Sequence, residues 1–234
     1  MCIYKAAGIC YDSGTIMANF RKMRTVLNVA MFASLTASAG FCITGGFLHE
    51  AVGAVTFVLF LIHAFLNRRW FGSVVSGGYS APRFLGTAAN FSLALLSIIV
   101  FSTGTMLSTY LFDFGGASMQ VRQVHSVCGY WLFVLAGVHI GLHGFGLRLG
   151  GSLWLRVLWA SGVLALAAFG AWSWGERAMS DKLFFGYSFD FWNGDYPSVL
   201  FFAENVSIAY VAAFSVRVFL QVLKKLKNKG KAKK

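Results

Sequence analysis

Long apolar runs separated by short polar segments dominate the chain, and each run approaches the roughly 20 residues that a membrane-spanning helix needs. The runs are continuously apolar rather than alternating, which favours helices over the strands of a barrel. The pattern therefore predicts an all-α integral membrane protein. Six spans are predicted, over residues 25–45, 47–66, 84–107, 124–147, 153–174 and 199–223.

Turn and charge signals divide the chain into four segments. They are a cytoplasmic N-terminal segment, a four-helix core, a further hairpin with an aromatic outer connection, and a Lys-rich cytoplasmic tail, at residues 1–24, 25–147, 148–223 and 224–234. The first segment lacks the apolar stretch of a secretory signal. The first two spans are expected to form a tight hairpin, because the connection between them, around Thr44, Gly45 and Gly46, is very short.

Composition agrees with a membrane protein, since 57% of the residues are hydrophobic and only 12% are charged, with a mean hydropathy of +0.66. The net charge of +12 would suit a nucleic-acid partner, but its placement indicates membrane topology instead. With the N-terminus inside, seventeen of the 20 Lys and Arg residues fall on the cytoplasmic side, and most acidic residues fall outside. We therefore predict a multi-pass protein with both termini in the cytoplasm, a tail that contacts membrane lipid, and no nucleic-acid partner.

Two histidine pairs share one spacing and one local sequence. His49 and His63 stand at positions i and i+14, and so do His125 and His139. In both segments a glycine follows the first histidine at i+4, and a Phe-Val-Leu triplet leads on toward the second histidine. The two glycines are Gly53 and Gly129. Such self-similarity predicts a repeated structural unit.

Fourteen helical steps return to within about 40° of the starting face and rise about 21 Å. Each repeat therefore presents two imidazoles on one face at two depths, on helices that run in the same direction. His49 is expected to pair with His125 near the outside, and His63 with His139 near the inside. Bis-imidazole sites in helix bundles commonly hold haem. We therefore predict two non-covalent b-type haems with these four histidines as iron ligands, and room for the flat macrocycle at the two glycines.

Other interpretations of these residues are weaker. The histidines could be interhelical hydrogen-bonding groups, and the glycines could only bring helices close, but a fourfold repeat argues against this. Zinc is disfavoured because two layers about 21 Å apart cannot form one tetrahedron. None of the four cysteines lies in a CxxCH motif, so covalently attached haem is not indicated.

His143 lies one turn after His139, on nearly the same face. It could replace His139 as the inner ligand, bond a haem propionate, or serve a quinone. We favour His139 as the ligand because only this residue preserves the i to i+14 spacing.

Three arginines lie near the histidine segments. Arg122, one turn before His125, could equally pair with a haem propionate or anchor the helix at the interface. Arg68 and Arg69 follow His63 and fit the anchoring role better.

Two acids and one amide complete the candidates. Glu50 and Glu204 lie near the outer ends of spans and could carry protons for a quinone, although solvated interfacial carboxylates are more common. Asn90 is expected to make an interhelical hydrogen bond.

Helical histidine pairs with this i to i+14 spacing, repeated on two parallel helices, resemble the two-haem core of the cytochrome b group. The local sequence is similar to that of the flavinylation-associated cytochromes, a smaller bacterial group. The similar motifs are TGGFLHE (44–50), HAFLNRRWF (63–71), RQVH (122–125) and HIGLH (139–143). The resemblance covers roughly residues 24–145, and the chain departs from it at Gly144, where a Trp is expected.

This resemblance implies a cytochrome of the bacterial cytoplasmic membrane that passes electrons to extracytoplasmic proteins carrying covalent FMN. We expect an electron-transfer subunit rather than a stand-alone enzyme, supplied by quinol or by a cytoplasmic-side donor. A second hypothesis is a quinone-linked membrane anchor of a respiratory dehydrogenase or reductase. A third, a non-redox transporter or sensor, is weakened by the lack of broken-helix signals.

Overall fold

The computed structural model describes residues 5–6, 9–10, 13–76, 78–114, 116–143, 152–186 and 196–232. In this part of the chain the helices are α1 (Ser13–Ser38), α2 (Phe41–Leu66), α3 (Arg69–Val74), α4 (Ala81–Leu107), α5 (Met119–His143), α6 (Leu153–Glu176), α7 (Met179–Leu183) and α8 (Ser198–Ala232). Two short antiparallel strands, β1 (Lys5–Ala6) and β2 (Ile9–Cys10), precede them. Apart from this small ladder, the predicted all-α architecture is confirmed.

Five of the described helices, α2, α4, α5, α6 and α8, are long and apolar enough to cross a membrane. The chain is therefore a multi-pass membrane protein whose spans contact lipid. The first predicted span is not among the five, because it joined the second half of α1 to the start of α2. The N-terminal half of α1 carries Arg21, Lys22 and Arg24, which leaves an apolar part shorter than the roughly 20 residues of a full span.

The connection between the first two helices begins earlier than predicted. α1 ends at Ser38, and α2 begins at Phe41 after a two-residue link. Gly45, which the sequence pattern places in the link, has a non-helical backbone with φ 74° and ψ 175°. Glycine adopts a positive φ without a Cβ clash, and this non-helical residue divides α2 into a first turn at residues 41–44 and the long helix that follows, so the predicted break at this position is observed.

The predicted bounds of the later spans are close to those observed. Residues 144–147, the end of the fourth predicted span, lie outside the described residues, as do residues 187–195 of the aromatic connection. At both ends the helices extend further than expected. α1 begins at Ser13, inside the predicted N-terminal segment, and α8 runs to Ala232, through most of the predicted Lys-rich tail.

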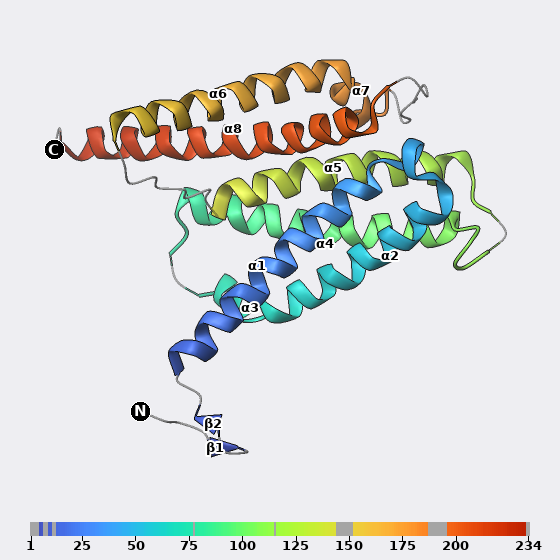
Figure 1. The fold of residues 1–234 in the computed structure, drawn as a ribbon, viewed down its shortest axis with the longest axis horizontal. Coiled ribbons are helices and arrows are strands. Elements are labelled where there is room, and N and C mark those ends of the chain that lie inside the picture. Colours follow the sequence, from blue (N-terminus) through green and yellow to red (C-terminus); the bar gives the residue numbers. More distant parts are fainter. Residues whose placement is uncertain are drawn as a thin grey trace.

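The central helix of the fold is α5, which packs against α4 on one side and α8 on the other, while α8 also packs against α6 (Figure 1). Glycines allow the close approach of α8. A Cβ at Gly137 or Gly141 of α5 would lie 2.4 or 2.3 Å from a main-chain oxygen of α8, and one at Gly170 of α6 would lie 2.2 Å from another. Small residues at close helix contacts are typical of packed membrane helices. The contacts at Gly137 and Gly141 hold α8 against α5, and the contact at Gly170 holds α6 against α8.

α2 stands apart from α5, although both helices are described along their whole length. α2 packs against α1 and contacts α4, but it does not pack along α5, and none of its residues is buried. The space between α2 and α5 is where the four repeated histidines lie.

Candidate functional site

The histidines of the repeat lie in two pairs across the space between α2 and α5. The ring centroids of His49 and His125 are 6.0 Å apart, and their planes are 71° apart. The ring centroids of His63 and His139 are 6.4 Å apart, with an interplanar angle of 75°. These are the two pairs that the i to i+14 spacing predicts.

The ring separations fit two imidazoles bound to opposite sides of one metal ion. Two metal–nitrogen bonds of about 2 Å, and about 1 Å from each nitrogen to its ring centre, put such rings about 6 Å apart. Among the described residues, no group of three or more His, Cys, Asp or Glu side chains could hold a bare metal ion. The donor set therefore suits haem, whose porphyrin supplies the other four ligands, better than a protein-only metal site; ligation by these histidines stays a prediction.

Both outer histidines donate a hydrogen bond from Nδ1 to a main-chain carbonyl. The Nδ1 atom of His49 lies 2.9 Å from the carbonyl oxygen of Ser38, the last residue of α1. The Nδ1 atom of His125 lies 3.0 Å from the carbonyl oxygen of Val100 and 3.1 Å from Oγ1 of Thr103. A carbonyl only accepts, so Nδ1 carries the hydrogen and Nε2 keeps the lone pair that a metal ligand needs.

The inner histidines are held differently. Nδ1 of His63 donates to the side-chain Oδ1 of Asn28 on α1, at 3.0 Å. Nδ1 of His139 is buried and has no hydrogen-bond partner among the described residues. His143 is exposed, and its ring centroid lies 4.6 Å from that of His139. The ring beside His63 is thus that of His139, in agreement with the spacing.

A cavity of about 390 Å³ surrounds the outer pair, with walls from α2, α4 and α5. This volume lies within the range of about 300–1,000 Å³ that is usual for cofactor sites. Gly53 and Gly129 line it together with Arg122, and a Cβ at either glycine would meet nothing within 4 Å. These glycines therefore do not bring helices together; they leave room beside the histidines.

Sequence reasoning assigned no chemistry to several residues that hold the histidines. They are Asn28, Thr103 and Gly104, on α1 and α4. A Cβ at Gly104 would lie 3.1 Å from Cε1 of His125, so the missing side chain lets this ring lie against α4. These contacts join residues far apart in the sequence, and no local pattern marks them.

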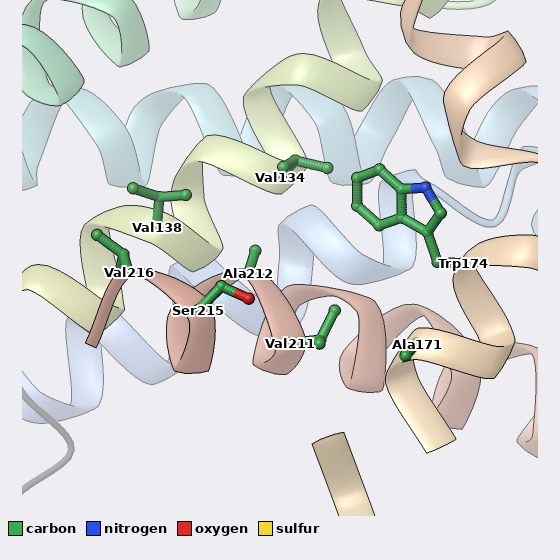
Figure 2. Close-up of a pocket in the computed structure, with 8 residues that line it drawn as sticks. All are labelled: Val134, Val138, Ala171, Trp174, Val211, Ala212, Ser215 and Val216. Atoms are coloured by element: carbon green, nitrogen blue, oxygen red, sulfur yellow. The ribbon is translucent and has the colours of Figure 1, made fainter. Parts of the chain in front are cut away.

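A second cavity, of about 530 Å³, lies between α5, α6 and α8. Figure 2 shows Val134 and Val138 of α5 near Ala212 and Val216 of α8, with Trp174 of α6 at one end. None of its eight lining residues, all of them described, is ionisable or a metal ligand. This apolar groove fits contact with lipid, and it lies away from the histidine pairs.

Glu50 anchors the chain that follows α4. Its carboxylate accepts hydrogen bonds from the Ser108 hydroxyl at 2.7 Å and from the main-chain N–H groups of Thr109, Tyr110 and Leu111 at 2.9, 3.1 and 3.1 Å. Charge-assisted bonds of this kind are among the stronger ones in proteins. Glu50 is therefore not a freely solvated carboxylate, and its contacts favour a structural role over proton transfer.

We expect Glu50→Ala to loosen this outer turn, because the N–H groups of Thr109 and Tyr110 and the Ser108 hydroxyl lose the carboxylate that accepts from them, and the Leu111 N–H keeps only the Ser108 hydroxyl as acceptor. Hydrogen bonds to a charged group contribute about 1.5–3 kcal/mol each. Amide hydrogen exchange at Thr109, Tyr110 and Leu111 is expected to become faster by at least about tenfold. The control is Glu176→Ala, which removes an exposed acid at the end of α6. Unchanged exchange in Glu50→Ala would contradict the anchoring role.

Glu204 is buried, with 1% of its side chain exposed, and it is not the solvated acid that its sequence position suggests. A guanidinium nitrogen of Arg177 lies 2.5 Å from its carboxylate, and the Tyr196 hydroxyl donates to the same group. Burial raises the pKa of Tyr196 and the bond to Glu204 raises this pKa further, so the phenol stays protonated as a donor. The ion pair ties the end of α6 to α8.

The three candidate arginines of the sequence analysis lie at or near the ends of helices. Arg68 donates to the carbonyl oxygen of Phe65 and its guanidinium lies 4.5 Å from the Phe65 ring centroid, which agrees with an anchoring role. Arg69 begins α3. Arg122 lies in the lining of the outer cavity, one turn from His125, where a carboxylate of a bound group could reach it.

The residues thus form two sites at two depths, each with paired imidazoles, and three of the four rings are oriented through Nδ1. Comparisons with known proteins add nothing to this geometry: no family model, no curated protein and no solved structure matches the chain. What the sites bind has to follow from their own chemistry.

Proposed function

We propose that the chain is a b-type cytochrome that carries electrons across a membrane through two bis-histidine haems. The observation that supports this most directly is the ring separation of 6.0 and 6.4 Å in two histidine pairs. On each helix the two histidines stand at i and i+14, which corresponds to a rise of about 21 Å. Two sites at this spacing would let an electron cross the bilayer in several shorter transfers instead of one long transfer.

Each residue of the repeat has a role in this proposal. His49 and His125 hold the outer haem, and His63 and His139 hold the inner one. Bound at these two depths, haem supplies one-electron exchange. Gly53 and Gly129 give the ring space, and the apolar walls of the outer cavity keep water away from it. Arg122 is placed to neutralise a propionate.

The proposed partners follow from topology and from the family resemblance. Five long spans alone would put the two termini on opposite sides of the membrane. We propose that α1, which packs against α2, crosses the membrane with it despite its shorter apolar part, so that both termini face the cytoplasm. The placement of the Lys and Arg residues along the sequence favours this arrangement. Quinol or a cytoplasmic-side donor then supplies electrons to the inner site. The acceptor is an extracytoplasmic protein, for which the resemblance to flavinylation-associated cytochromes of bacterial cytoplasmic membranes suggests an FMN-bearing protein.

A second candidate is a quinone-linked membrane anchor of a respiratory dehydrogenase or reductase. The observation that favours it is His143, whose exposed ring lies 4.6 Å from that of His139 at the inner end of α5. An exposed imidazole beside a redox centre is well placed to exchange a proton with a quinone. Both candidates require the same two haems and differ only in the partner.

A reduced-minus-oxidised optical spectrum with a haem count tests the proposed function. Protein purified from a haem-replete host is expected to show a b-type absorbance and two haems per chain. Protein from a haem-depleted host serves as the control and should lack the absorbance. Colourless protein from the replete host would overturn the proposal, and one haem per chain would overturn its two-site form.

A further inference from the structure

The outer and inner histidines differ in what orients their rings. Main-chain carbonyls of Ser38 and Val100 accept from Nδ1 of the two outer histidines. The acceptor for His63 is instead a side-chain amide, that of Asn28. Substitution cannot remove a carbonyl of the main chain, but it can remove or replace an amide. Both outer histidines therefore keep a main-chain acceptor whatever the sequence, although the Thr103 hydroxyl also lies 3.1 Å from Nδ1 of His125, whereas the acceptor of His63 depends on one side chain.

The repeat places a second asparagine in the position that corresponds to Asn28. Asn28 and Ser38 stand at i and i+10 on α1, and Asn90 and Val100 stand at i and i+10 on α4. The pairing of α1 with α2 resembles that of α4 with α5, because in each the first helix supplies a carbonyl to the outer histidine of the second. Asn90 therefore has the position relative to α5 that Asn28 has relative to α2.

Contacts at the outer pair place Asn90 at the level of His139. Gly104 of α4 faces His125, since a Cβ there would lie 3.1 Å from this ring. The step from Gly104 back to Asn90 has the same length as the step from His125 forward to His139. The two helices run in opposite directions, so the same step along both reaches the same depth and nearly the same face. Asn90 and His139 are therefore opposite each other across the α4–α5 contact.

Asn90 and His139 each have a buried polar atom without a hydrogen-bond partner among the described residues, and one of these atoms can accept what the other can donate. Oδ1 of Asn90 and Nδ1 of His139 are both buried, and neither has a hydrogen-bond partner among the described residues. Buried polar atoms are nearly always paired in native structures. One of these atoms is an acceptor, and the other carries a hydrogen when Nε2 binds a metal.

We propose that Asn28 and Asn90 are the positioning residues of the inner haem, which accept hydrogen bonds from Nδ1 of His63 and His139. This inference rests on the proposed function. An acceptor on Nδ1 makes the imidazole a stronger electron donor to iron, which stabilises the oxidised state. The two amides thereby help to set the reduction potential of the inner haem, while the corresponding acceptors at the outer histidines are main-chain carbonyls that these substitutions leave in place.

Redox titration of the full-length protein tests this, because the outer haem serves as an internal reference. Asn28→Asp and Asn90→Asp each supply a stronger, charged acceptor, so each is expected to lower the midpoint potential of the inner haem and leave the outer one unchanged. Asn28→Leu and Asn90→Leu remove the acceptor and are expected to raise the same potential. The low-spin ferric resonance of the inner haem should shift with it. The inner titration wave is the one that disappears in His63→Ala.

Asn67→Asp is the matched control, because Asn67 lies one turn after His63 and its amide contacts only the His63 carbonyl oxygen rather than the ring. An equal shift in Asn67→Asp would show that charge alone acts, and would overturn the inference. So would unchanged inner potentials in the Asn28 and Asn90 variants, or equal shifts of both haems. If one aspartate variant does not accumulate, the leucine variant at the same position decides by the opposite shift. Wild-type protein without haem would instead overturn the proposed function itself.

Discussion

His125→Ala is expected to remove the outer haem and leave the inner haem in place. The outer and inner pairs lie about 21 Å apart in depth on each helix, so loss of one axial ligand opens only one site. His49→Ala should give the same result, whereas His63→Ala and His139→Ala should each remove only the inner haem. The measurement is haem per chain after purification, which is expected to fall from two to one in every case, with a different optical component lost for each pair.

His143→Ala is the matched control, since this ring lies 4.6 Å from His139 but does not complete a repeat. It should retain both haems. Loss of the inner haem in His143→Ala, with retention in His139→Ala, would show that His143 rather than His139 is the inner ligand. Two haems in all four single variants of the repeat would refute the pairing.

Gly129→Leu is expected to abolish binding of the outer haem without unfolding the protein. A Cβ at this position meets no protein atom within 4 Å, so the leucine side chain extends into open cavity space rather than into a neighbouring helix. The cavity would then lose the room that a flat ring beside His125 requires. Haem content should fall from two to one per chain, while the inner optical component and the yield of folded protein stay as in the wild type.

Two glycine variants on other helix faces separate this effect from general disruption. Gly162→Leu adds the same side chain to α6 at a position that is also open, away from the histidines, and should leave both haems bound. Gly137→Leu forces a side chain into the α5–α8 contact, where a Cβ would lie 2.4 Å from a main-chain oxygen, and should reduce the yield of folded protein. A Gly129→Leu protein with two haems would show that the cavity is not the binding site.

The features that could be predicted from the sequence are those that repeat or that extend over a long stretch of chain. Hydropathy over long windows predicts α2, α4, α5, α6 and α8 because a bilayer demands about 20 apolar residues from each. The i to i+14 spacing predicts which histidines lie together, because helix geometry alone fixes the face and depth of each ring. Neither argument needs knowledge of tertiary contacts.

The features that could not be predicted depend on single contacts between distant residues. The TGG sequence at residues 44–46 predicts the break at Gly45, but no local pattern predicts that α1 ends at Ser38 and that a separate helical turn at residues 41–44 precedes the break. Glu50 looks like an interfacial acid until Ser108 and the N–H groups after it are seen to surround its carboxylate. Asn28 lies in a helix with no chemical motif, and its relation to His63 becomes visible only when the two helices are paired.

Although α2 packs against α1, it has no buried residue and does not pack along α5, so the cavity wall that it forms is not held from the side of α5. A newly inserted chain would complete this wall only as cofactor arrives, and until then α2 would be the segment most accessible to membrane proteases. We therefore expect cellular abundance to follow haem supply, so that biogenesis and quality control are coupled through one loosely held helix.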